Sequence, residues 1–141
     1  MFKKILLILQ SLFFASSAPV ASHHNRNKAL DYVQKGLSLM GQGRHEEAIK
    51  NYDTAIDLYP NDANFYYAKA IIFGELEKHE RVLSYCDKAI TLKLKNSMPY
   101  YNKAVVLSNL EQKQEALEVC NRPTNTYKLK NFVITVMGHT N

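Results

Sequence analysis

The sequence repeats itself with a period of 34 residues, and this feature constrains the fold more than any other. The recurring positions are Tyr32, Tyr66 and Tyr100; Lys35, Lys69 and Lys103; Gly36, Ala70 and Ala104; Leu39, Phe73 and Leu107; Ala48, Val82 and Ala116; and Tyr52, Cys86 and Cys120. A fixed period of this kind indicates one supersecondary unit that is repeated along the chain. Each unit then buries its apolar face against the next one, because a single unit cannot cover that face alone.

Each period predicts a helical hairpin. In the first copy Tyr32, Gly36 and Leu39 lie at i, i+4 and i+7, which is one stripe of a helix. Two glycines interrupt that helix, and a second apolar series with helical spacing follows until Pro60 stops it. The expected helices cover about residues 28–41, 45–59, 63–76, 79–93 and 97–110. The sequence therefore predicts an all-α protein, an α-solenoid of stacked helix-turn-helix hairpins.

The repeated unit resembles the tetratricopeptide repeat, or TPR. The residues that carry the resemblance are Tyr32, Gly36, Leu39, Ala48, Tyr52, Ala55 and Pro60, which follow the family's order of large, small and proline positions. The resemblance covers roughly two thirds of the chain and implies a TPR-like superhelix, with repeats at 29–62 and 63–96. A third repeat, at 97–122, is incomplete, because Pro123 stands where its second helix would continue.

The amino-terminal end of the chain differs in kind from the repeats. Lys3 and Lys4 precede an apolar run and small residues follow, which is the layout of a secretory signal peptide over 1–22. The apolar run is shorter than the roughly 20 residues that a spanning helix needs. We therefore expect an exported protein, periplasmic or secreted, without a stable membrane span; an interfacial helix that stays attached is the alternative. The polar residues 23–28 carry no apolar period and predict a linker.

Residues 123–141 form a C-terminal tail that does not fit the repeat. Leu129, Phe132, Val133 and Val136 have helical spacing and suit a helix that covers the open end of the solenoid. The same segment is rich in β-branched residues, which favour a strand. A third interpretation is a shortened or frame-shifted gene, whose tail was never selected for this fold. The sequence leaves all three open.

Charge and motifs argue against nucleic-acid binding and catalysis. The formal net charge of +5 comes from the two ends, because 11 basic residues face 13 acidic ones between Ala29 and Asn121, a net of −2. No basic binding face for nucleic acid is therefore expected. His45 and His79 recur in phase at the start of each second helix, so packing explains them better than acid–base catalysis. No nucleophile elbow, phosphate-binding loop or metalloprotease motif occurs, and we predict no enzyme activity and no cofactor.

The cysteines and the paired histidines receive structural interpretations. Cys86 and Cys120 occupy the same position of neighbouring second helices. Packed helices have axes about 8–10 Å apart, whereas a disulfide needs Cα atoms within roughly 7 Å. We expect two small apolar core residues rather than a disulfide, although an exported protein meets an oxidising compartment. His23 and His24 have no third ligand nearby in the sequence, so no metal site is predicted.

The first helix of each unit carries a second stripe besides the one that faces its hairpin partner. This stripe consists of Val33, Leu37 and Met40, then Tyr67 and Ile71, then Tyr101 and Val105. In the TPR family the first helices line a concave surface, so the resemblance implies that these side chains face it. An apolar and aromatic groove of this kind suits an extended peptide or a partner helix. The alternative is that the stripe only packs neighbouring helices together.

The resemblance also bears on a carboxylate clamp. TPR proteins that clamp a C-terminal carboxylate use Lys and Asn within this stripe, and Val33 and Leu37 replace them here, so no such clamp is expected. The recurring Lys35, Lys69 and Lys103 are expected along the hairpin edge, with their stems covering apolar surface.

These patterns predict a non-catalytic protein–protein interaction module, exported from the cytoplasm, that binds a peptide or partner helix on an apolar concave face. The alternative is a truncated remnant of a longer repeat protein with no independent function, because about three intact repeats are usually needed for stability. An uncovered third hairpin would expose apolar surface and favour self-association.

Overall fold

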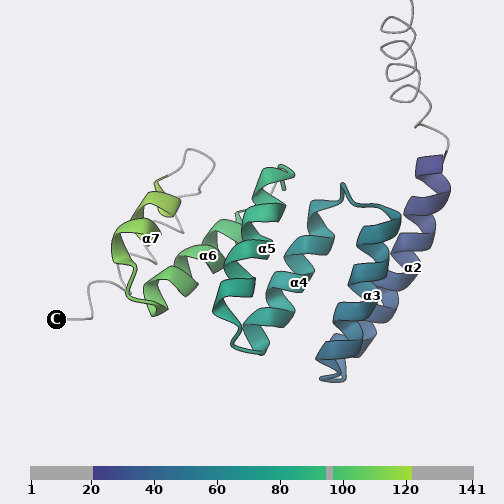
Figure 1. The fold of residues 1–141 in the computed structure, drawn as a ribbon, viewed down its shortest axis with the longest axis horizontal. Helices are drawn as coiled ribbons and strands as arrows, with labels where there is room; N and C mark the ends of the chain where they lie inside the picture. The colour runs from purple at the N-terminus through teal and green to yellow at the C-terminus, as the bar shows by residue number, and fades with distance from the viewer. Residues whose placement is uncertain (1–20, 95–96, 122–141) are drawn as a thin grey trace, which may run out of the picture.

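A computed structural model describes residues 21–94 and 97–121 as a row of helices (Figure 1). The helices are α2 (Ala21–Gly41), α3 (His45–Leu58), α4 (Ala63–Glu75), α5 (His79–Thr91), α6 (Met98–Asn109) and α7 (Lys113–Cys120). They form three hairpins, α2–α3, α4–α5 and α6–α7, and each hairpin packs against the next in chain order. The prediction of an all-α solenoid of stacked hairpins is confirmed.

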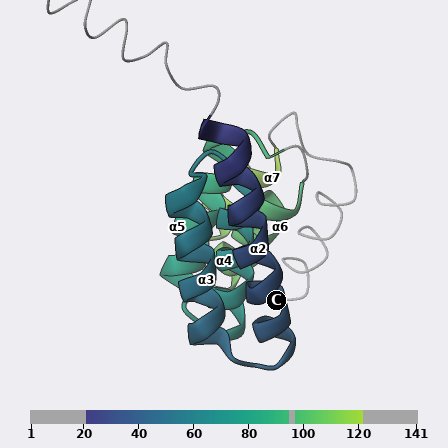
Figure 2. The ribbon, with the colours of Figure 1, turned by 90° about the vertical axis from the view of Figure 1, so that its right-hand side faces the viewer.

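The second helices of the first two hairpins lie on one side of the stack. In Figure 2, α3 and α5 lie on one side, while α2 and α6 lie on the other. Of the described helices, none has the length and apolar character that crossing a membrane requires. The signal peptide and the C-terminal tail fall almost wholly outside the described residues, and their interpretations stay predictions.

The prediction of a linker over 23–28 is wrong. These residues are helical and belong to α2, which begins at Ala21. Neither glycine nor proline interrupts the chain between the start of α2 and Gly36, so the helix extends backward from the buried Ala29 without a stop signal. Most of the polar side chains in the segment are exposed, which is why it shows no apolar period.

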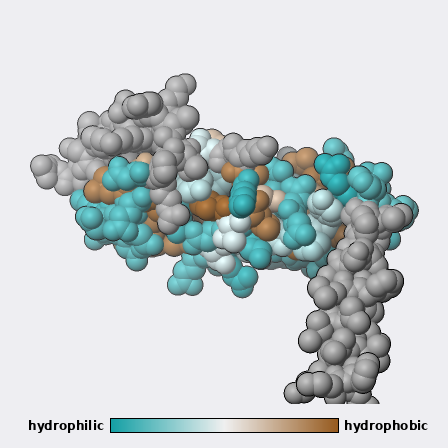
Figure 3. Space-filling model, turned by 90° about the horizontal axis from the view of Figure 1, so that it is seen from above, coloured by the Kyte–Doolittle hydropathy of each residue, from teal (hydrophilic) through white to brown (hydrophobic). Residues whose placement is uncertain are grey.

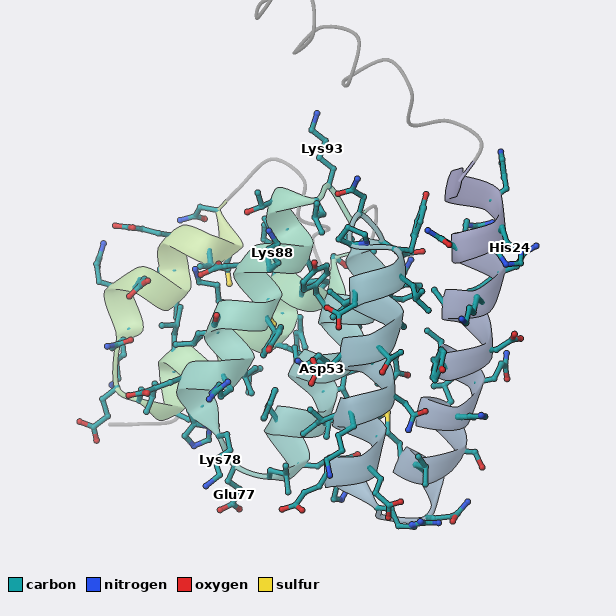
Figure 4. All side chains as sticks on the ribbon, turned by 45° about the vertical axis from the view of Figure 1, so that its right-hand side comes forward. His24, Asp53, Glu77, Lys78, Lys88 and Lys93 are labelled. Carbon is teal, nitrogen blue, oxygen red and sulfur yellow. The ribbon has the colours of Figure 1, made fainter. Side chains whose placement is uncertain are left out.

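The turn inside each hairpin is built in the same way. Gly43, Glu77 and Glu111 occupy equivalent positions and have positive φ angles of 72°, 54° and 60°. Across each turn a backbone N–H donates to a carbonyl five residues earlier: Arg44 to Leu39, Lys78 to Phe73 and Gln112 to Leu107, each at 2.9 Å. This is the Schellman arrangement, which suits glycine best. The two glutamates adopt a left-handed backbone that their side chains disfavour, and Figure 4 shows Glu77 at such a turn.

Buried side chains between hairpins hold the stack together. Phe65 and Ile72 of α4 belong to the core that includes the first hairpin, and Val106 of α6 belongs to the core of the second. Asp31 and Ser38 of α2, which are equivalent to Phe65 and Ile72, are exposed. At these two positions α2 is therefore polar where α4 is apolar, because no hairpin in the described structure precedes α2.

Lys69 contradicts the expectation for the recurring lysines. Its side chain is only 5% exposed, and its Nζ pairs with the Asp53 carboxylate and donates to Tyr85 Oη at 2.7 Å. The same ammonium lies 4.4 Å from the centroid of the Tyr85 ring, which stacks on Phe73. A buried ammonium is tolerated here because a carboxylate, a hydroxyl and a ring face compensate its charge. Figure 4 shows Asp53 between α3 and the second hairpin.

The other two lysines are more open. Lys103 Nζ lies 2.7 Å from Asp87 Oδ1, and its side chain is 17% exposed. Lys35 is exposed, with its Nζ 5.6 Å from the centroid of the Tyr32 ring. An Asp–Lys pair therefore recurs at both junctions between hairpins, but only Lys69 is enclosed.

Cys86 and Cys120 are buried in the cores of the second and third hairpins, and no disulfide joins them. Burial raises the pKa of the Cys86 thiol to about 12, and the carboxylate of Asp87 adds to the rise. Both side chains pack as small apolar core residues, in line with the prediction.

Candidate interaction groove

A hollow of about 350 Å³ opens between α4 and α6, beside the start of α5. Its lining consists of the apolar Ala70, Ile71, Gly74, Val82, Val105 and Val106 and the polar Glu75, His79, Asn102 and Asn109. We call this site the α4–α6 hollow. Of the seven residues predicted for the partner-binding face, Ile71 and Val105 line it, one from each of the two first helices.

Tyr67 connects to the α4–α6 hollow through a neighbouring amide. Asn102, which lines the hollow, donates from its Nδ2 to Tyr67 Oη at 3.3 Å. Burial raises the pKa of the Tyr67 hydroxyl, and the neutral phenol is therefore the form that accepts this hydrogen bond. The hydrogen bond links α4 to α6 at the level of the predicted stripe.

The other four predicted residues lie outside the α4–α6 hollow. Tyr101 packs against the core of the third hairpin, and Val33 and Met40 pack against the core of the first. Packing, the alternative interpretation of the stripe, therefore accounts for these three. Leu37 is different, because 50% of it remains exposed on α2.

Further apolar side chains are exposed on the first helices. Leu30 of α2 is 37% exposed and Met98 of α6 is 46% exposed, so three of the large exposed apolar side chains, with Leu37, belong to first helices. The view from above also shows hydrophobic surface between hydrophilic patches (Figure 3).

Sequence reasoning missed Asn102 and Asn109 because, although it placed Val105 correctly, it put Tyr101 on the stripe instead of the adjacent Asn102. In α6 the lining residues Asn102, Val105 and Asn109 lie at i, i+3 and i+7, whereas the prediction was centred on Tyr101 and Val105. One residue turns an α-helix by about 100°, which is enough to move the polar amides into the lining.

Glu75 supplies the negative charge of the α4–α6 hollow, and its side chain is 48% exposed. The Nδ1 atom of His45 lies 3.2 Å from Glu75 Oε2, although outside hydrogen-bond geometry. His79, the equivalent of His45 in the second hairpin, lines the hollow itself. Among the described residues, neither lysine nor arginine contributes to this lining.

The chemistry of the site is that of a contact surface. In the part of the chain that the structure describes, no three or more His, Cys, Asp or Glu side chains are grouped to hold a metal ion. The lining is mainly apolar, and its amides are neutral donors and acceptors, which orient a bound chain rather than transfer protons.

Three stacked helical hairpins with a hollow between their first helices define a short α-solenoid. Residues 36–76 match the family of TPR repeats, and no curated protein matches the sequence. Residues 36–76 therefore have the sequence of a TPR repeat, and the described helices have the TPR fold, as the resemblance of the repeated unit implied.

Solved TPR structures share this fold. One is the first TPR of Spaghetti (RPAP3) bound to the HSP90 peptide SRMEEVD. It is 23% identical to this chain, the alignment covers 80% of this chain and 95% of the RPAP3 chain, and the TM-score is 0.68. The OM64 TPR domain of Arabidopsis is 21% identical, with coverage of 82% and 98% and a TM-score of 0.69. YrrB, described as a TPR protein with an unusual peptide-binding site, is 21% identical, with coverage of 86% and 68% and a TM-score of 0.68.

Proposed function

We propose that the protein is a non-catalytic interaction module that binds an apolar peptide or partner helix along its first helices, centred on the α4–α6 hollow. The observation that carries this proposal is the hollow itself, in which Ile71 and Val105 line a concave site on two successive first helices. The RPAP3 domain is bound to an HSP90 peptide and YrrB is described as having an unusual peptide-binding site, and these two proteins of the same fold support the same class of partner.

Packing of the third hairpin supports a working module over a remnant. Ala104, Leu107, Ala116 and Cys120 form a buried cluster between α6 and α7, so this hairpin has a core of its own. Three hairpins are about the number that a repeat protein needs to be stable.

Placing a carboxylate in the α4–α6 hollow tests the proposed function. Ile71→Glu and Val105→Glu are each expected to weaken partner binding at least about tenfold, because burying an uncompensated charge costs more than about 1.4 kcal/mol. Ser84→Glu is the matched control, since Ser84 is exposed on α5 and does not line the hollow. A crosslinking pull-down from native cells, with recovered partners quantified for each variant, provides the measurement.

The outcome is read together with the melting temperature of each variant. Partners that are lost in both hollow variants and kept in Ser84→Glu support the proposal. Partners that survive both Ile71→Glu and Val105→Glu, in proteins that still melt like the parent, contradict it.

We also propose that the protein acts outside the cytoplasm, in the periplasm or secreted. Lys3 and Lys4, the apolar run after them and the small residues up to Ser22 support this location. Protein isolated from its native cells is expected to begin between Ser17 and Ser22, and amino-terminal sequencing measures this. An intact Met1 in the native protein would contradict cleavage and favour the attached interfacial helix.

A further inference from the structure

We propose that the α4–α6 hollow selects a segment that is apolar and positively charged, and disfavours an acidic one. This inference deepens the proposed function and rests on it. The partner it specifies is a peptide segment in which Lys or Arg lies beside apolar side chains, with the cation placed against Glu75.

The preference for apolar side chains comes from the walls of the hollow. Ile71 and Val105 line it from α4 and α6, with Ala70 and Val82 beside them. None of these side chains offers a polar partner, so apolar side chains of the bound segment gain most from entering.

The preference for a positively charged segment comes from Glu75. Its carboxylate lines the hollow and is about half exposed, so an incoming ammonium or guanidinium can reach it without first becoming fully desolvated. Asn102 and Asn109 are neutral and favour neither sign of charge. An acidic segment would meet the Glu75 carboxylate as a like charge, which costs binding energy and suppresses the wrong partner.

The positive side chains of the two wall helices are engaged elsewhere. Lys69 is the basic residue of α4, and its ammonium is paired with Asp53 of α3. Lys103 is the basic residue of α6, and its ammonium lies 2.7 Å from Asp87 of α5. Because both lysines bind the second helix of the preceding hairpin, neither is available to neutralise an acidic ligand in the hollow.

The charge of the repeats does not oppose this preference. The formal net charge of +5 comes from the two ends of the chain, whereas residues 29–121 carry a net of −2. Because this weak negative charge also favours basic peptides, the Glu75 variants below are needed to assign the preference to one carboxylate.

The test uses three acetylated and amidated peptides that share the same Leu and Ala positions and carry Lys, Gln or Glu at all polar positions. Fluorescence anisotropy with the full chain, at low salt and pH 8 to limit histidine protonation, measures their affinities. The Lys peptide is expected to bind most tightly and the Glu peptide least, with a ratio of about two- to fivefold that shrinks as salt is added.

Variants assign the preference to one carboxylate. Glu75→Gln is expected to remove the difference in affinity between the Lys and Glu peptides, and Glu75→Lys is expected to reverse it. Glu80→Gln is the matched control, because Glu80 is exposed on α5 outside the hollow and the same change there should leave the order intact. His45→Ala keeps the carboxylate while removing its neighbour, and should retain the preference for the Lys peptide.

The possible results separate this inference from the proposed function. Equal affinities for the Lys and Glu peptides, both weakened by Ile71→Glu, overturn the charge selection and leave the proposed function standing. A preference for the acidic peptide, or one for the Lys peptide that survives in Glu75→Gln, also overturns the inference. Absence of binding by all three peptides overturns both.

Discussion

Asp53→Ala is expected to lower the free energy of unfolding by about 2 kcal/mol, because it leaves the buried Lys69 ammonium without its carboxylate. Breaking a fully buried pair in this way typically costs about 3–5 kcal/mol. Since the Asp53 side chain is 50% exposed, water screens the pair and the smaller figure applies. The remaining hydrogen bond to Tyr85 Oη compensates part of the charge. Chemical denaturation followed by the helical circular dichroism signal measures the change.

The second junction between hairpins provides the matched control. Asp87→Ala removes the equivalent carboxylate, but Lys103 is 17% exposed, so we expect a loss below about 1 kcal/mol. Lys69→Met in the Asp53→Ala background removes the stranded charge and keeps a flexible apolar stem, and should recover most of the loss. Equal losses at Asp53 and Asp87 would contradict the view that enclosure of Lys69 sets the cost.

The lysines show where a repeat pattern stops being informative. The period identified Lys69 and Lys103 as equivalent, and both do pair with an aspartate of the preceding hairpin. It did not distinguish their environments, because the side chain that encloses Lys69 is Tyr85, whose equivalent in the third copy is Val119. Equivalence in sequence fixes where a residue lies on its helix, while its neighbours decide whether it is buried.

The fold was more predictable than the candidate site for a related physical reason. Helix spacing, small residues at close approaches and helix-stopping residues all act locally, so they located α3 to α6 to within a few residues. The lining of the α4–α6 hollow depends on the rotation of two helices about their own axes, and one residue of offset exchanges Tyr101 for Asn102. No local signal in a single sequence fixes that rotation.

Between hairpins, one position of the first helix and the position that it faces on the second helix change side-chain size in opposite directions. Gly36 faces the buried ring of Tyr52, and an added Cβ at Gly36 would lie 2.8 Å from Tyr52 Cε2. In the second copy the same two positions are Ala70 and Cys86, which share a core cluster. A small residue thus faces the large side chain, and a slightly larger one faces the smaller thiol, because packed helices leave a fixed volume between them.

This exchange predicts that Gly36→Ala destabilises the fold, although alanine is the better helix former. The clash with the Tyr52 ring costs about 1–3 kcal/mol, while the gain in helix propensity is about 1 kcal/mol, so we expect a net loss of up to about 2 kcal/mol.

Gly74→Ala is the matched control, since its added Cβ meets only Val82 Cγ2 at 4.0 Å and should be neutral or stabilise by up to about 1 kcal/mol. In the Tyr52→Cys background, which copies the second hairpin, Gly36→Ala should cease to destabilise, and a double-mutant cycle in denaturant measures that coupling. The same loss in both backgrounds would mean that the ring of Tyr52 is not what requires glycine at position 36.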